Sequence, residues 1–409
     1  MARRPPRRDL ADNLFYQGQE PRRRPQRTPR ISEMIVGVGP MDMTLFVVIL
    51  FLVIIGIVMV FSASYGTAVS IFGNPLHFLF RNIGFATAGI VIMLIASYVS
   101  YFYIKATAPI FYIASVVFLM MLFFQGIMRL GAARWLSIPF TNFSFMPSEI
   151  ARAGLVFIVA YIFDKFPDAL SSWSGFGLVT GVVGIISLFV FASDYGSAVV
   201  LTTVGCGLIL MHTPYFWKHL GVYVGGAISL IAGLWIVMDP VRRGRVTTFL
   251  SLRFGDGNEV DISNEAFQIT QARLAIASGG TGGTGLGAGM QSTILPEAYN
   301  DFIFAIIVEE LGLVGGGLVI MLFVILLWRG IVIAKNAPDT FSSLTAIGIA
   351  FSIAIQAIIN IGVTIGILPT TGITMPFVSY GGTSLIISLA LMGVLLNISR
   401  YTRLYNIQK

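Results

Sequence analysis

The sequence predicts an all-α polytopic membrane protein with about ten transmembrane helices. Of its 409 residues, 56% are hydrophobic and only 11% are charged, whereas a soluble domain carries about 25% charged residues. The mean hydropathy is +0.84. The apolar residues gather in runs of about 20, the length that a helix needs to cross the hydrocarbon core. The chain therefore has too little polar surface to face water on all sides.

The ten predicted spans follow from these apolar runs and the polar breaks between them. Residues 175–212 are too long for one span, and the polar residues from Ser193 to Ser197 predict two helices that meet at a turn. The spans are predicted at residues 44–62, 82–98, 106–125, 148–163, 175–193, 197–212, 220–238, 302–328, 344–368 and 383–399. A large extracytoplasmic loop, residues 239–301, then lies between helices 7 and 8.

The placement of Lys and Arg predicts the orientation. Residues 1–40 form a disordered basic tail, with nine arginines in the first 30 residues. The transmembrane domain covers residues 41–400 and a short C-terminal tail covers residues 401–409. Positive residues favour the cytoplasmic side, so both termini are predicted to be cytoplasmic. The basic tail is either an anchor that sets this topology or a contact for phospholipid or for a partner.

Arginines on the opposite side run against this charge bias, and no lysine accompanies them. Arginine offers a planar, permanently charged fork that suits phosphate. The arginines therefore indicate an anionic, lipid-linked ligand, although pairing with acids in the same loop is an equal alternative. The members that we assign to substrate binding are Arg134, Arg152, Arg242, Arg243 and Arg245.

Metal and nucleotide motifs are missing from the sequence. Cys206 is the single cysteine, and the three histidines lie far apart, so no Cys/His metal cluster is predicted. The glycine-rich segment 279–289 lacks the Lys-Ser or Lys-Thr of a phosphate-binding loop. This segment is either a flexible connection or a place where the backbone approaches another segment closely.

Acidic residues at the start of predicted helices are the main candidates for chemistry. Asp301 stands where the large loop enters a long apolar helix, either as a general base or as a helix N-cap. Glu309 and Glu310 lie deeper in the same helix, where ionisable groups are costly and usually functional. Together with Asp194, these two glutamates are assigned a structural or relay role.

Two further segments complete the candidate site. Pro147 and Glu149 make a good helix start, and Glu149 can pair with Arg152 three residues later. Trp135, close by in sequence, is either a site residue or an interface anchor. Glycines and a proline break the backbone before the last span, so residues 372–384 favour a cavity wall that contains Ser379 and Tyr380.

The order of these motifs resembles the SEDS family (shape, elongation, division and sporulation) over about residues 40–400, and its cell-division (FtsW-type) branch more than its rod-elongation (RodA-type) branch. The residues that carry the resemblance are Phe61 to Ser64, Gly131 to Trp135, Pro147 to Glu149, Asp194 to Ser197, Leu295 to Phe304, Glu309 to Gly312 and Pro376 to Gly382. The sequence departs from the family at Tyr299-Asn300, where His-Thr is usual, and at Arg152, where lysine is usual.

The resemblance implies an inverting peptidoglycan glycosyltransferase of the bacterial cytoplasmic membrane, acting at the division septum. Such an enzyme polymerises lipid II at the outer face and releases undecaprenyl diphosphate. Asp301 matches the family's essential acid and would be the base. Trp135 and Glu149 match motif positions near the cavity, and Glu297 belongs to the motif that contains Asp301. Arg134 and the loop arginines would stabilise the leaving diphosphate.

The resemblance also implies partners and leaves alternatives open. The expected partners are a class B penicillin-binding protein that supplies the transpeptidase, other division proteins and membrane lipids, with no nucleic acid. No cofactor is certain, although a divalent cation, Mg²⁺ or Mn²⁺, is possible. The alternatives are a lipid II flippase, a RodA-type elongation polymerase and a non-catalytic scaffold that activates its partner.

Overall fold

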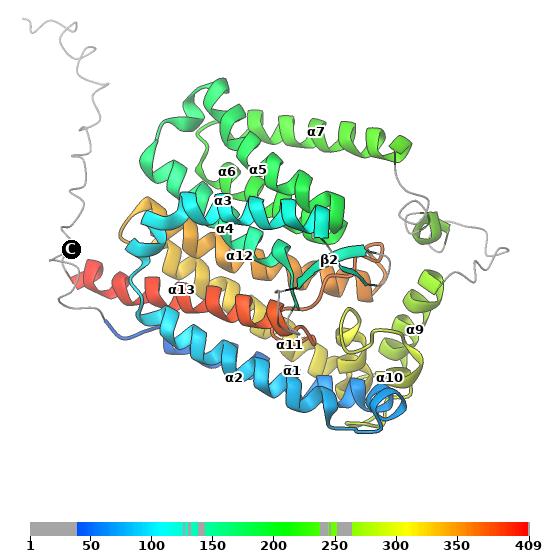
Figure 1. The fold of residues 1–409 in the computed structure, drawn as a ribbon. Coiled ribbons are helices and arrows are strands. Elements are labelled where there is room, and N and C mark those ends of the chain that lie inside the picture. The colour runs from blue at the N-terminus through cyan, green and yellow to red at the C-terminus, as the bar shows by residue number, and fades with distance from the viewer. Residues whose placement is uncertain are drawn as a thin grey trace, which may run out of the picture. The chain divides into compact units, whose positions relative to one another are not determined.

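Among the residues that the structure describes, ten long helices form a bundle, and each corresponds to one predicted span (Figure 1). The computed structural model describes residues 39–125, 127–129, 132–137, 144–237, 244, 247–251 and 264–407. The long helices are α1 (Met43–Phe72), α2 (His77–Tyr98), α3 (Tyr101–Gln125), α4 (Pro147–Lys165), α5 (Trp173–Ser193), α6 (Tyr195–His212), α7 (Phe216–Val237), α11 (Ile303–Lys335), α12 (Thr340–Thr364) and α13 (Gly382–Ile407). The predicted turn at residues 193–197 is confirmed, because Asp194 alone separates α5 from α6.

Short elements join these helices. They are the strands β1 (Ile127–Arg129), β2 (Ala132–Ser137) and β3 (Ser144–Phe145), the 3₁₀ turn η1 (Ala169–Ser171), and the helices α9 (Asn264–Gly279) and α10 (Gln291–Ile294). The strands form antiparallel pairs in the order β1-β2-β3. The described part of the predicted loop 239–301 thus includes α9 and α10, and α13 continues to Ile407, into the predicted C-terminal tail.

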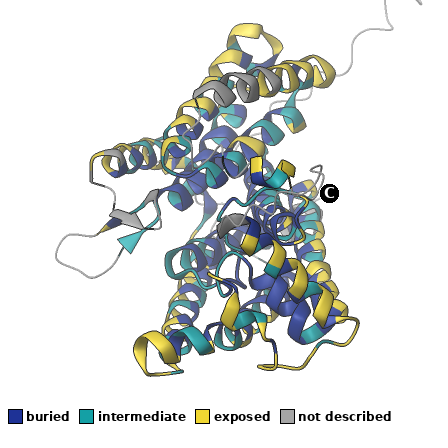
Figure 2. Ribbon diagram, turned by 90° about the vertical axis from the view of Figure 1, so that its right-hand side faces the viewer, coloured by how far each residue is buried: buried dark blue, intermediate teal, exposed yellow. Residues whose placement is uncertain are grey.

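The bundle exposes apolar side chains on its outer faces and buries others inside, as a protein dissolved in lipid must (Figure 2). Phe51, Phe80 and Leu188 are more than half exposed. Within the described residues, eight of the helices are long and apolar enough to cross a membrane. Helix α4 is not among them because it carries Glu149, Arg152 and other charges. That helix is buried over most of its length, so protein rather than lipid surrounds these charges.

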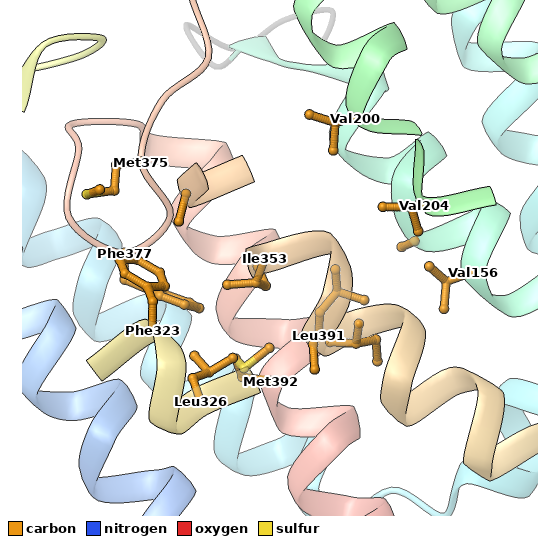
Figure 3. Packing of buried hydrophobic residues seen from close by; sticks show 14 of the residues in the cluster. Val156, Val200, Val204, Phe323, Leu326, Ile353, Met375, Phe377, Leu391 and Met392 are labelled. Carbon is orange, nitrogen blue, oxygen red and sulfur yellow. The ribbon is translucent and has the colours of Figure 1, made fainter. Parts of the chain in front are cut away.

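The interior is closely packed from helices that are distant in sequence. Figure 3 shows Phe323 and Leu326 of α11 beside Met392 of α13 and Phe377 of the loop before it. Helices α2 and α13 lie side by side (Figure 1). A Cβ atom at Gly393 would lie 2.4 Å from the backbone oxygen of Met93, so only glycine permits this approach.

The first span begins, and the last span ends, on the same side of the bundle. The backbone N–H of Gly39 donates to the carbonyl of Arg400 at 3.1 Å, and that of Asp42 donates to Ser399 Oγ at 3.0 Å. An even number of spans requires this arrangement. It also places the starts of α2, α4, α6, α11 and α13 together at the opposite end, on the side of the large loop.

Helix α11 is broken at Gly312, whose φ of 70° and ψ of −173° are open only to glycine. The glycine-rich segment 279–289 fills this break. Thr284 N–H donates to the carbonyl of Glu309 at 2.9 Å, and Leu313 N–H donates to the carbonyl of Gly280 at 3.0 Å. The break therefore leaves these backbone groups satisfied at membrane depth. Of the two sequence-based alternatives for this segment, the structure shows the close backbone approach.

Candidate active site

A cavity of about 380 Å³ lies at the end of the bundle where α2, α4, α6, α11 and α13 begin. Its walls come from segments spread over most of the chain. The predicted site residues that line the cavity are Arg134, Trp135, Glu149, Asp194, Glu297, Asp301 and Tyr380. The fold therefore brings seven of the predicted residues to one place, although they span more than half of the sequence.

Asp301 lies in this cavity on a strained turn just before α11. The turn closes with hydrogen bonds from the N–H groups of Asn300 and Asp301 to the carbonyl of Glu297, at 2.9 and 3.2 Å. Glu297 has a φ of 57°, which a non-glycine residue rarely adopts. Helix α11 starts at Ile303 with Phe302 as its N-cap residue. The N-cap alternative for Asp301 is therefore wrong, and its carboxylate faces the cavity.

A second loop, residues 372–381, holds the turn in place. Ser379 Oγ donates to the carbonyl of Asn300 at 2.6 Å, and the N–H of Tyr380 donates to the carbonyl of Tyr299 at 2.9 Å. Ser379 Oγ also accepts from the N–H of Met375 at 2.7 Å. Ser379 is 4% exposed and holds the loop, whereas its neighbour Tyr380 lines the cavity.

One wall of the cavity is charged. A nitrogen of the Arg134 guanidinium lies 3.2 Å from a carboxylate oxygen of Asp194, whose other oxygen accepts from Ser197 Oγ. The Arg134 Nη1 atom and the Asp301 carboxylate both approach Gly372. Arg134 on β2 and Asp301 before α11 thus face the same small space.

Glu149 and Arg152 form a buried pair at the floor of the cavity. Their side chains approach to 2.5 Å, and Glu149 also accepts from Ser384 Oγ at 3.1 Å. The Arg152 guanidinium donates to Gln356 and Ser388 as well. The predicted pairing along α4 is confirmed. Glu149 reaches the large cavity, whereas Arg152 is 3% exposed and lines only a much smaller space beneath it.

Three aromatic rings also line the cavity. The ring of Phe78 lies 4.9 Å from that of Tyr299 and 5.2 Å from that of Tyr380, and the two tyrosine rings are 5.9 Å apart. Burial raises the pKa of Tyr299 to about 12, with help from Glu297. Burial also raises the pKa of Tyr380, against the influence of Arg81. Both hydroxyls therefore keep their protons at neutral pH.

Other predicted residues lie away from the cavity or outside the described part of the chain. Arg242, Arg243 and Arg245 are outside the described residues. Glu309 and Glu310 are buried and do not line the cavity. Glu309 accepts from the N–H of Gln291 at 3.1 Å, and Glu310 accepts from Ser62 Oγ at 2.7 Å. These contacts tie α11 to α1 and to the first residue of α10.

The sequence alone did not point to several cavity residues. Phe78, Arg81 and Gln356 line the cavity, but they lie within apolar helices far from the recognisable motifs. Arg81 is exposed and has no ion-pair partner among the described residues. The one available signal for Arg81 was its place on the predicted outer side of the membrane, where arginines occur without lysines. Among the described residues, no group of three or more His, Cys, Asp or Glu side chains is placed to hold a metal ion.

The helices and this cavity define a polytopic α-helical membrane protein with an acid, an arginine and aromatic rings in a pocket at one end of the bundle. Residues 42–404 match the family of FtsW, RodA and SpoVE, described as "Cell cycle protein", and the chain belongs to this family.

Named relatives of similar length agree with this assignment. The chain is 35% identical to a probable peptidoglycan glycosyltransferase FtsW from Halomonas elongata, over 88% of this chain and 91% of the relative. It is 36% identical to stage V sporulation protein E of Bacillus subtilis, over 88% and 98% of the two chains.

Solved structures share the fold. A chain of a peptidoglycan synthase complex that coordinates polymerisation and crosslinking superposes with a TM-score of 0.73, 24% identity, and coverage of 88% of this chain and 98% of that one. The rod shape determining protein RodA of Thermus thermophilus gives a TM-score of 0.65 at 23% identity, over 88% and 97% of the two chains.

Proposed function

We propose that this protein is an inverting glycosyltransferase that polymerises lipid II into peptidoglycan and releases undecaprenyl diphosphate. One observation carries the proposal most directly. Asp301 lies on a strained, hydrogen-bonded turn inside a cavity that also contains Arg134 and a wall of aromatic rings. Relatives named as peptidoglycan glycosyltransferases cover nearly the whole of the membrane domain and support the same activity.

The chemistry needs a base, a cation and a place for two sugars. Asp301 accepts the proton of the acceptor hydroxyl as the hydroxyl oxygen attacks the anomeric carbon of the donor. The bond from that carbon to the diphosphate breaks, and the configuration inverts. Negative charge grows on the diphosphate, where the fixed guanidinium of Arg134 stabilises it. Arg81, at the same cavity, offers a second cation, and the loop residues Arg242, Arg243 and Arg245 are proposed to add to this field.

The remaining predicted residues are proposed to support this site. Asp194 orients Arg134 through their ion pair, and Arg152 holds Glu149 at the cavity floor. Glu309 and Glu310 are proposed to anchor the broken part of α11, since their oxygens bind Gln291 and Ser62. Glu297 and Ser379 shape the turn of Asp301, and Trp135 and Tyr380 contact substrate. A divalent cation, Mg²⁺ or Mn²⁺, at the diphosphate remains a proposal.

The protein is an integral membrane protein of the family named above. A solved structure with a similar fold is a chain of a peptidoglycan synthase complex. We propose that both termini are cytoplasmic, which puts the cavity on the outer face. At the end of the described bundle where α1 begins and α13 ends lie four lysines, Lys105, Lys165, Lys218 and Lys335. The positive-inside rule places such lysines on the cytoplasmic side. We further propose a class B penicillin-binding protein as partner and the division septum as location.

The decisive experiment is polymerisation of lipid II by the purified full-length protein in detergent. Glycan polymer and undecaprenyl diphosphate should appear together, alone or with the transpeptidase partner. A flippase or a scaffold would make neither product in detergent, because no membrane is left to cross and the partner's transpeptidase joins peptides, not sugars. Absence of polymer in both conditions would reject the assignment.

A further inference from the structure

The cavity is lined by two unlike groups of residues, and the base and the Arg134 cation described above belong to only one of them. Arg134, Asp194 and Asp301 make a polar wall where charge develops. Facing the same space are Phe78 of α2, Tyr299 of the turn and Tyr380 of the loop before α13. Their ring centroids are 4.9 to 5.9 Å apart, and the Tyr380 ring meets the other two edge-to-face, so the three rings pack together as one aromatic surface of the cavity.

The aromatic surface has a fixed position relative to Asp301. Tyr299 is two residues before Asp301 on the same turn, and the carbonyl of Tyr299 accepts from the N–H of Tyr380 at 2.9 Å. Phe78 is 7% exposed and packs against both tyrosines. A ligand that rests on these rings is therefore held at a set distance from the carboxylate.

The two tyrosines also present polar edges. Both are half-buried and line the cavity, and neither hydroxyl has a hydrogen-bond partner among the described residues. An aromatic face beside free hydroxyl groups suits a pyranose ring. One face of such a ring carries axial C–H groups that pack on aromatic rings, and its edges carry hydroxyl and amide groups that form hydrogen bonds.

We propose that Phe78, Tyr299 and Tyr380 form a sugar-stacking subsite that binds the N-acetylhexosamine ring of the acceptor. The acceptor, rather than the donor, fits this place because the reacting hydroxyl must lie beside Asp301, while the donor diphosphate lies toward Arg134. This inference rests on the proposed function, but it assigns a specific ring of the substrate to residues that the base and the cations do not use.

The test separates ring stacking from simple loss of packing. Tyr299→Leu and Tyr380→Leu remove a ring, whereas Tyr299→Phe keeps the ring and loses only the hydroxyl. Tyr401→Leu is the matched control, because Tyr401 is also half-buried and also packs on an aromatic ring, that of Tyr101 at 5.0 Å, but at the far end of the bundle. Thermal unfolding of each full-length variant in detergent checks that it is folded.

Two measurements are made on the folded variants. The KM for lipid II should rise about five- to tenfold in each leucine variant, less in Tyr299→Phe, with kcat changed far less. Saturation-transfer NMR with an N-acetylglucosamine tetrasaccharide should show transfer from aromatic protons of the protein to the C–H protons of the sugar. That transfer should fall in the two leucine variants at the cavity but persist in Tyr401→Leu.

The outcomes distinguish this inference from the proposed function. If the wild-type protein polymerises lipid II but neither leucine variant changes KM or sugar contact, the subsite is rejected and the polymerase stands. The same holds if Tyr401→Leu raises KM as much as the cavity variants. If the wild type makes no polymer yet binds the tetrasaccharide through these rings, the sugar subsite stands and the polymerase is rejected.

Discussion

The side-chain nitrogen of Asn360, near the C-terminal end of α12, lies 2.8 Å from the backbone oxygen of Asp301. The same nitrogen donates to the carbonyl of Ile373 at 2.7 Å. Asn360 is 1% exposed and is not among the residues that line the cavity. It joins the turn that carries Asp301 to the loop that packs against it, which makes it a positioning residue.

Asn360→Ala should therefore lower kcat about tenfold while KM changes little, because two buried carbonyls lose their donor and the turn moves. Asn397→Ala is the control. Asn397 is equally buried and also bridges segments, by accepting from Tyr101 N–H and donating to Ser97, but it lies at the other end of the bundle. Steady-state kinetics on both folded variants should separate them. Equal kcat values would show that Asn360 acts on stability alone.

Asp301→Asn tests the base. The amide keeps the size of the side chain but cannot take a proton from the acceptor hydroxyl, so polymerisation should fall about 10²- to 10⁴-fold. Thermal unfolding should change little because Asp301 does not cap α11. Asp168→Asn, on the exposed turn before η1, serves as the control with full activity. An asparagine variant at position 301 that polymerises like the wild type would remove Asp301 from the mechanism.

Local sequence patterns predicted the helices well because lipid imposes a simple rule on them. All ten long helices lie at predicted spans, since about 20 apolar residues in a row have no other stable arrangement. The starts of α4 and α6 were also found, because Pro147 and Asp194 are local signals. The helix ends were less certain: α1 continues to Phe72, beyond the predicted residue 62, since its last turns face the large loop segment.

The site was predicted only where polar residues interrupt apolar runs. Asp301, Arg134 and Tyr380 lie in such interruptions. Asn360 lies inside a helix, where a single amide looks like ordinary packing, and Phe78 lies in the first turn of α2, ahead of the predicted span. Their roles depend on which helices are neighbours, and no local pattern contains that information. The same reason explains why Glu309 and Glu310 were placed in the right helix but were not assigned their partners, Gln291 and Ser62.

Gly312→Ala tests the break in α11. The new Cβ would lie 2.4 Å from backbone atoms of Thr281 and Gly283, and alanine would be strained at a φ of 70°. We expect a loss of about 2 kcal/mol or more in the free energy of unfolding. Gly317→Ala is the control in the same helix, because a Cβ there meets nothing within 4 Å. Thermal unfolding in detergent measures both, and equal stability of the two variants would contradict the close approach of segment 279–289.

Arg134→Lys tests whether the guanidinium fork matters beyond its charge. Lysine keeps the positive charge, but a single ammonium cannot bind Asp194 and a diphosphate oxygen with the same planar geometry. We expect polymerisation to fall about tenfold.

For the loop, simultaneous alanine substitution of Arg242, Arg243 and Arg245 should weaken binding of lipid II, measured with the purified protein. Unchanged binding by that triple variant would reject a role for the loop arginines.

The basic N-terminal tail separates a role in division from a role in elongation. Its nine arginines within the first 30 residues should hold it near anionic lipid, at about 1 kcal/mol for each residue close to the surface. With the cytoplasmic termini proposed above, the membrane would lie between this tail and the cavity.

Deletion of residues 2–30 should therefore leave polymerisation in detergent nearly intact, because no substrate contact is lost. In cells, the same deletion should disturb placement at the septum or contact with cytoplasmic division proteins. Fluorescent fusions of the full-length and shortened proteins measure this directly. If both fusions spread along the side wall, and depleted cells lose their shape but continue to divide, the protein acts in elongation instead.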